Sequence, residues 1–258
     1  MHTHQLSIHV ADPANLPDAF NEFEFLISSY YTSGQKLGKQ HTVYVDGDTL
    51  VCIIQAHEET SLSTEHNNYY VTLRIERLEQ LCGNKIEVKL LGKTHEEQTV
   101  CACAKSDFYL LIADHAAIDS PVKCGTCFDV VPLYKLPAYY EHGYAPVLNW
   151  ETNYQAVDAL QIDGEVGEEW ATEQMSNPNS ELSIQGRAVC AGIEEKTGIN
   201  TYYYLHNTKE NTVEQELDSV CPACQTPWLL TTPLANGIFP FKCDNCRLIS
   251  AFSINLVG

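Results

Sequence analysis

The chain has 258 residues, of which 44% are hydrophobic and 19% charged, so a packed core is feasible and wholesale disorder is excluded. The formal net charge of −19 makes most of the surface repel a polyanion such as DNA or RNA. No stretch approaches the about 18 unbroken apolar residues of a membrane span, and no basic segment followed by an apolar run opens the sequence. We therefore expect a cytoplasmic protein that makes no membrane contact.

The first third of the chain alternates between strand and helix patterns. Apolar residues at period two or at helical spacing predict six elements in the order strand, helix, strand, strand, helix, strand, at residues 5–11, 16–30, 41–45, 49–55, 71–82 and 85–91. That order is typical of a ferredoxin-like sandwich. We expect an α+β domain of this kind over residues 1–98.

Residues 99–206 predict a mixed α/β middle region. Strands are predicted at 108–113 and 199–205, and helices after Pro146 and after Ser180, a good helix N-cap. Residues 164–179 are acidic and rich in turn-forming residues. Residues 207–218 are polar and acidic, and we interpret them as a linker to a C-terminal module at 219–258.

The eleven cysteines cannot all pair in disulfides, because their number is odd. In a reducing compartment they are thiols or metal ligands. Six of them form three C-x-x-C pairs, at Cys124–Cys127, Cys221–Cys224 and Cys243–Cys246.

The last two pairs have the spacing of a zinc ribbon. Eighteen residues separate them, and the strand-like runs 228–230 and 239–242 flank the turn Asn236-Gly237. Four thiolates at about 2.3 Å would close a tetrahedron around Zn²⁺ and leave no open coordination position. We therefore predict a structural zinc site at Cys221, Cys224, Cys243 and Cys246, with the metal supplying the folding energy of a separate small module. An iron–sulfur cluster is the alternative occupant.

Several motifs together resemble one family. They are Lys123-Cys124-Gly125-Thr126-Cys127, Val131-Pro132-Leu133-Tyr134-Lys135-Leu136-Pro137, Cys221-Pro222-Ala223-Cys224 and Phe241-Lys242-Cys243-Asp244-Asn245-Cys246-Arg247-Leu248. The sequence resembles an uncharacterised family of bacterial proteins with a C-terminal zinc ribbon, described as candidate nucleic-acid-binding proteins. The resemblance covers most of the chain and implies a function by analogy. Gln225 and Arg247 depart from common ribbons, because glycine is frequent at the position after each cysteine pair.

The middle pair, Cys124 and Cys127, leaves three alternatives open. Cys101 and Cys103 lie about twenty residues upstream, and a hairpin would bring the four thiols together in a second zinc site. The pair is otherwise a set of reduced structural thiols, or a redox pair whose thiol pKa is lowered by Lys123. His115 or His142 is a further candidate ligand. The sequence thus predicts one Zn²⁺, or two if the second site forms.

No catalytic signature is present, and a zinc ion held by four protein ligands cannot activate water, so we expect no enzyme. Two binding functions remain. In the first, the C-terminal module contacts nucleic acid through Lys242, Arg247 and Trp228, weakly and with a preference for single strands. In the second, the module and the acidic surface bind a basic protein partner, as an adaptor, an antitoxin-like inhibitor or a subunit of a larger assembly.

Overall fold

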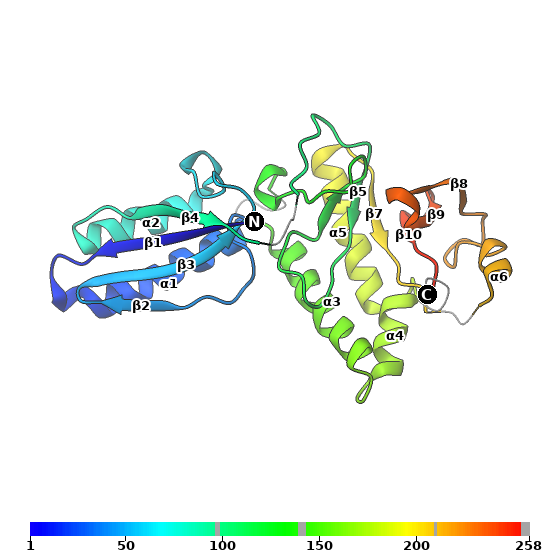
Figure 1. The fold of residues 1–258 in the computed structure, drawn as a ribbon, viewed down its shortest axis with the longest axis horizontal. Helices are drawn as coiled ribbons and strands as arrows, with labels where there is room; N and C mark the ends of the chain where they lie inside the picture. The colour runs from blue at the N-terminus through cyan, green and yellow to red at the C-terminus, as the bar shows by residue number, and fades with distance from the viewer. Residues whose placement is uncertain (96–98, 139–142, 209–210, 254–258) are drawn as a thin grey trace. The chain divides into compact units, whose positions relative to one another are not determined.

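Two units make up the chain in this computed structural model, which describes residues 1–95, 99–138, 143–208 and 211–253 (Figure 1). The first unit contains residues 1–100, 118–120 and 129–145, and the second contains 101–117, 121–128 and 146–258. The predicted middle region therefore contributes short segments to the first unit. The predicted division of the chain at residues 98, 206 and 218 stays a prediction.

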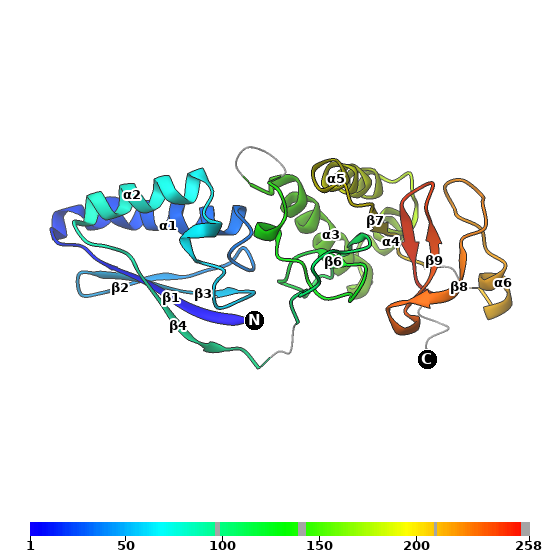
Figure 2. The same cartoon turned by 90° about the horizontal axis from the view of Figure 1, so that it is seen from above.

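The first unit is a four-stranded sheet with two helices on one face (Figure 2). Its elements are β1 His2–His9, α1 Leu16–Thr32, β2 Val43–Asp46, β3 Thr49–Ala56, α2 Tyr69–Cys82 and β4 Glu87–Lys93, with short 3-10 turns at Pro13–Asn15, Thr64–His66 and Leu133–Lys135. The strand order is β2-β3-β1-β4, and every neighbouring pair is antiparallel. This is the ferredoxin-like arrangement that the sequence predicted, and the α+β class is confirmed.

Alternation along the strands and helical spacing on α1 supply the core of the first unit. Leu6 and Ile8 of β1 are buried and face Phe23 and Ile27 of α1 in the same apolar cluster. The Asn68 side chain accepts a 3.0 Å hydrogen bond from the Val71 amide at the start of α2. The sequence signals for these elements therefore describe their ends as well as their faces.

The second unit has a six-stranded sheet in the order β6-β5-β7-β10-β9-β8, with helices packed against it. The elements are β5 Tyr109–Leu111, β6 Val122–Cys124, α3 Ala145–Asp163, α4 Glu168–Ser176, α5 Glu181–Thr197, β7 Thr201–Tyr204, α6 Val213–Leu217, β8 Leu229–Leu234, a 3-10 turn at Ala235–Gly237, β9 Phe239–Cys243 and β10 Leu248–Ser250. Ser180 caps α5 by accepting from the Ser183 amide at 3.1 Å, as predicted.

Strand β7 directs its tyrosines to the two faces of this sheet. Tyr203 meets the Trp150 ring of α3 at 5.9 Å, and α5 approaches so closely that a Cβ on Gly186 would lie 2.2 Å from Tyr203 Cε2. On the opposite face Tyr202 joins an apolar cluster with Phe108 and Phe239. The glycine at 186 is therefore required by packing.

The C-terminal module is part of this sheet, which the sequence did not predict. β10 pairs with β9 on one side and runs parallel to β7 on the other, where Tyr203 N donates to Arg247 O at 2.8 Å. The expected separate ribbon thus shares its third strand with the middle region. The pairing of β10 with β7 joins segments that are distant in sequence, so no local sequence pattern indicates it.

Two acidic segments contain helices that the sequence did not indicate. Residues 164–179 hold α4, which buries Ala171 and Met175 one turn apart and carries Glu168 and Glu169 in its first turn, where the helix dipole favours negative charge. The segment interpreted as a linker holds α6, which begins at a capping box between Thr212 and Gln215.

Glu216 of α6 is 1% exposed and accepts hydrogen bonds from the Asn207 side chain at 3.0 Å and the Ser253 amide at 3.3 Å. This short helix is therefore tied to the segment that follows β7 and to the segment that follows β10. Among the helices in the described ranges, none is long and apolar enough to cross a membrane.

Candidate metal centres

The four C-terminal cysteines converge in what we call the ribbon site, Cys221, Cys224, Cys243 and Cys246. Cys221 and Cys224 lie in the turn before β8, Cys243 ends β9, and Cys246 lies in the turn that leads to β10. Their four Sγ atoms lie within 4.8 Å of one another, and Cys224 Sγ is 3.6 Å from Cys243 Sγ. A tetrahedron with Zn–S bonds of 2.3 Å has sulfur–sulfur edges of about 3.8 Å, so the donor set fits zinc.

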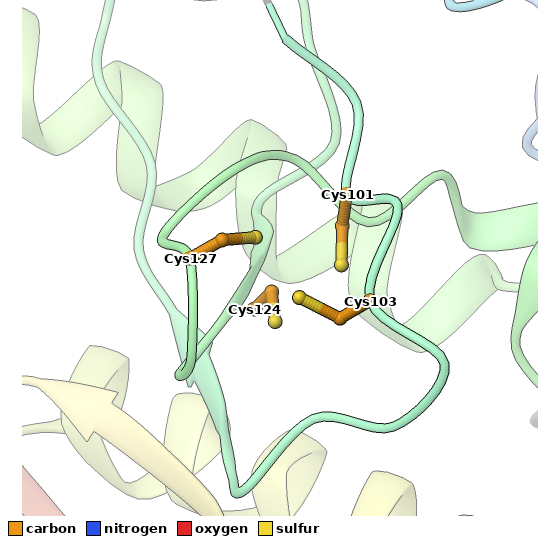
Figure 3. Close-up of side chains that lie close together, drawn as sticks. All are labelled: Cys101, Cys103, Cys124 and Cys127. Carbon is orange, nitrogen blue, oxygen red and sulfur yellow. The ribbon is translucent and has the colours of Figure 1, made fainter.

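The four middle cysteines form a second cluster, the edge site, Cys101, Cys103, Cys124 and Cys127. Cys124 is the last residue of the edge strand β6, and Cys127 follows in the next turn. Cys101 and Cys103 come from the irregular segment before β5, and Figure 3 shows the four side chains gathered around a common centre. These sulfurs also lie within 4.8 Å of one another. Of the alternatives for the middle pair, the structure favours the one that joins it to Cys101 and Cys103.

The three C-x-x-C turns share one backbone feature. The residue after each pair, Phe128, Gln225 and Arg247, has a positive φ, of 62°, 60° and 54°. In the first two, the amide of that residue donates 2.8 Å to the carbonyl of the first cysteine. A non-glycine residue with positive φ is uncommon and strained. The edge-site turn therefore repeats the turn of the ribbon site, and Gln225 and Arg247 adopt the conformation that glycine supplies in common ribbons.

Side chains around the edge site hold its two halves together. Ser106 Oγ lies 3.2 Å from Cys124 Sγ and accepts from the Gly125 amide at 3.0 Å. The Asp107 amide donates to Thr126 Oγ1 at 3.0 Å. Gly125 allows the turn to lie against the Phe108 ring, because a Cβ there would be 2.4 Å from Cγ of that ring. Sequence inspection missed Ser106, Asp107 and Thr126, since short polar residues in a loop carry no signal of their own.

One thiol in each cluster is poised to be a thiolate. Burial raises the pKa of Cys124, but hydrogen bonds from Ser106 and from the Cys127 and Thr126 amides outweigh it and bring that pKa to about 6. The side-chain and backbone hydrogen bonds of Thr226 lower the pKa of Cys224 to about 6. Since metal ligands must be deprotonated, each cluster offers a first ligand near neutral pH.

The clusters differ in exposure. In the edge site Cys103 and Cys127 are exposed, Cys101 is half-buried and Cys124 is buried. In the ribbon site Cys221 and Cys243 are buried, at 0% and 3% exposure, and the other two are half-buried. Two residues of the edge site are therefore exposed, and none of the ribbon site is.

The two candidate histidine ligands do not join the cysteines among the described residues. His115 belongs to a third group with Asp114 and Asp158, and its Nδ1 lies 3.2 Å from Asp158 Oδ2. The Asp158 carboxylate also accepts from the His115 amide at 2.8 Å. His142 lies outside the described residues.

The three residues considered for nucleic-acid contact have partners within the protein. Lys242 Nζ lies 2.7 Å from Asp244 Oδ1 and 4.5 Å from the Tyr202 ring centroid. Arg247 makes a two-pronged ion pair with Glu194, with both contacts at 3.0 Å, which also lowers the Glu194 pKa. Trp228 is 7% exposed and stacks on Phe241 at 5.1 Å.

Comparison with protein families gives three matches along the chain. Each is described as a domain of unknown function: DUF8589 at residues 1–92, DUF2310 at 103–206 and DUF8594 at 210–256. An uncharacterized protein of Haemophilus influenzae is 31% identical over 90% of this chain and 90% of its own length. A second uncharacterized protein of the same organism is 34% identical over 66% of this chain and 83% of its own length.

Similar solved structures match about a third of the chain. A crystal structure of an antibiotic biosynthesis monooxygenase has 11% identity and a TM-score of 0.31, covering 36% of this chain and 99% of that one. A conserved protein from Methanosarcina mazei Go1 has 14% identity and a TM-score of 0.30, covering 36% and 95%.

Proposed function

This chain belongs to the same family as the two Haemophilus influenzae relatives, and we propose that it is a non-enzymatic zinc protein with two structural four-cysteine sites. In this proposal the ribbon site and the edge site each hold one Zn²⁺. The two sites lie toward opposite edges of the six-stranded sheet, the edge site at β6 and the ribbon site at β8 and β9. The metals fix the ends of the sheet that carries the helices of the second unit.

The observation that carries the proposal is the convergence of both sets of four sulfurs within 4.8 Å. The positive φ after each C-x-x-C pair supports it, because this strained turn recurs at all three pairs. Four thiolates in a tetrahedral arrangement favour zinc, and they leave no position for a substrate or water.

Metal analysis of the full chain, purified without added metal, tests this function. We expect two zinc ions per chain, falling to one in Cys124→Ser and to one in Cys243→Ser. Cys82→Ala is the matched control, because Cys82 is buried outside both clusters, and it should keep two. A visible absorption band from iron, or a zinc content unchanged in both serine variants, contradicts the assignment.

A second candidate function is the recognition of a basic protein. It is supported by the helical hairpin of α3 and α4, where Ile162, Val166 and Trp170 are 54%, 76% and 53% exposed. Exposed Glu165, Glu168, Glu169 and Glu173 surround them in sequence, and no Lys or Arg occurs between Lys135 and Arg187. An exposed tryptophan among apolar neighbours is typical of an interface anchor, and the charge selects a cationic partner.

The same observations weigh against nucleic acid as the main ligand. Lys242, Arg247 and Trp228 would have to leave their intramolecular partners before contacting a strand, and the net charge of −19 opposes a polyanion. We therefore expect single-strand binding no tighter than about 10 μM at physiological salt, where non-specific binding usually lies.

Tryptophan fluorescence tests the hairpin surface, because Trp150 and Trp228 are buried and Trp170 is exposed. A lysine- and leucine-rich peptide should shift the emission to shorter wavelength and protect Trp170 from acrylamide, with an affinity that falls as salt rises. Because Trp170→Ala removes this reporter, the binding of the variants is measured from the fluorescence anisotropy of a dye-labelled form of the peptide. Binding should weaken about tenfold or more in Trp170→Ala, because a central aromatic anchor contributes about 2 kcal/mol or more. Ile238→Ala, at an exposed turn of the ribbon, is the control. Equal binding by all three proteins contradicts a hairpin interface.

A further inference from the structure

The edge site differs from the ribbon site in the exposure of its cysteines, which is one of the two properties that govern attack by an oxidant on a zinc-bound thiolate. Cys103 and Cys127 are exposed, whereas the ribbon site has no fully exposed cysteine. Oxidation of cysteine follows thiolate character and access, and zinc coordination supplies thiolate character at both sites. The exposure of the cysteine residues therefore distinguishes the edge site from the ribbon site.

The segments that carry the edge-site cysteines also have less regular secondary structure. Cys101 and Cys103 lie in a segment with neither helix nor strand, and Cys127 lies in a turn beyond the end of edge strand β6. In the ribbon site Cys243 is the last residue of β9, which is paired on both sides, and Cys221 N donates to Thr226 O at 2.9 Å. A disulfide needs two sulfurs to approach to about 2.05 Å, so one of the two segments that carry the cysteines must move.

Within the edge site Cys103 and Cys127 are the pair suited to joining. They come from the two different ligand segments, and Figure 3 shows their side chains entering the cluster from opposite sides. Their sulfurs lie within 4.8 Å of each other, and both residues are exposed. Cys124, by contrast, is buried at the end of β6.

We propose that the edge site is a redox-labile zinc site, in which a peroxide joins Cys103 and Cys127 as a disulfide and expels Zn²⁺ while the ribbon site keeps its metal. This inference rests on the proposed function, since it requires zinc at both sites. Loss of the ion would separate the segment that carries Cys101 and Cys103 from the turn at Cys124 and Cys127.

The reaction balances with hydrogen peroxide as the oxidant. The first thiolate attacks one peroxide oxygen, the O–O bond breaks, and a sulfenic acid and hydroxide form. The second thiolate attacks the sulfenic sulfur, the S–S bond forms, and a second hydroxide leaves. The two sulfurs lose two electrons and the peroxide gains them. Zn²⁺ is released because Cys101 and Cys124 alone cannot complete its coordination. A dithiol reductant with added zinc reverses the reaction.

The test uses the full chain loaded with zinc and treated with limiting hydrogen peroxide. Released zinc is followed with a chromophoric chelator, and disulfides are located by alkylation and peptide mass mapping. We expect one zinc to leave at least about tenfold faster than the other, with a Cys103–Cys127 disulfide, because oxidation rate follows sulfur access. Equal release rates, faster release from the ribbon site, or a disulfide at another pair overturns the proposal.

Two variants sharpen the test. Cys103→His keeps a zinc-donating side chain but cannot form the disulfide, so rapid release should disappear. Cys246→His is the matched control in the ribbon site and should leave rapid release from the edge site intact. If Cys103→His fails to hold zinc, the disulfide map of the parent protein still decides. A parent protein that starts with one zinc refutes the proposed function itself, whereas two zincs released equally refute only this inference.

Discussion

At the residue scale, the side chains that follow the cysteine pairs matter as much as the ligands. Gln225 has a φ of 60° and is exposed, with its side-chain amide donating to Pro222 O at 3.3 Å. Arg247 has a φ of 54°, and its guanidinium forms an ion pair with Glu194 and donates a hydrogen bond to Asn200 Oδ1. Each residue accepts a strained backbone so that two sulfurs can point at one centre.

Substitutions at Gln225 should reveal that strain. A left-handed conformation costs a residue with a Cβ about 1–2 kcal/mol, and a β-branched side chain makes it worse. Gln225 already bears this cost, so Gln225→Val should add only the crowding of its β-branch and lower the free energy of unfolding of the zinc-loaded protein by about 1 kcal/mol. Gln225→Gly should leave it unchanged or raise it slightly, because the relief of strain is partly offset by the backbone entropy of glycine. Denaturant unfolding of each variant measures the difference.

Gln80→Val supplies the control for this comparison, because Gln80 is an exposed glutamine in the helix α2. It should cost only the few tenths of a kcal/mol expected from helix propensity, up to about 0.7. Similar losses at Gln80 and Gln225 would mean that the turn stores no strain.

At the scale of elements, β10 determines how the second unit is built. Its three residues, Leu248–Ser250, are buried and link the strands of the ribbon site to those of the middle region. Cys246 precedes it by two residues, and the Arg247 carbonyl accepts from Tyr203 N. A proposed zinc ligand and the pairing to β7 are thus neighbours in the chain. For this reason a metal bound at the ribbon site would act on the sheet rather than on a separate module.

At the scale of the whole molecule, this connection changes the expected effect of metal loss. The sequence predicted that the ribbon would fold on its own zinc. Because β10 lies between β9 and β7, loss of the ribbon metal should also weaken β7, even though the nearest ligand lies outside it. Structural zinc contributes about 10–16 kcal/mol in small zinc domains, enough to affect a shared sheet.

Hydrogen exchange of Cys243→Ser measures that spread. We expect faster exchange at residues 239–250 and also at the amides of Tyr203 and Leu205, which donate to Arg247 and Ile249. The amides of β1 and β3, in the first unit, should keep their protection. Faster exchange confined to residues 221–250 would restore the idea of an independent ribbon.

The sequence by itself determined the features that depend on local patterns. Period-two and helical spacing indicated the order of the six elements of the first unit, and Ser180 and Gly198 marked the two ends of α5 through side-chain capping and left-handed backbone. Cysteine spacing singled out the four cysteines of the ribbon site, because a C-x-x-C turn directs both sulfurs to one side regardless of what surrounds it.

Only the tertiary structure decided what depends on partners far away in sequence. It brought Cys101 and Cys103 to Cys124 and Cys127, paired β10 with β7, and neutralised Lys242 and Arg247 with carboxylates. It also formed α4 and α6 in acidic segments, where buried faces and caps outweigh a polar composition. The physical reason is common to all of these. The energies of burial and pairing come from contacts with residues that are distant in sequence, and local sequence patterns do not indicate which residues those are.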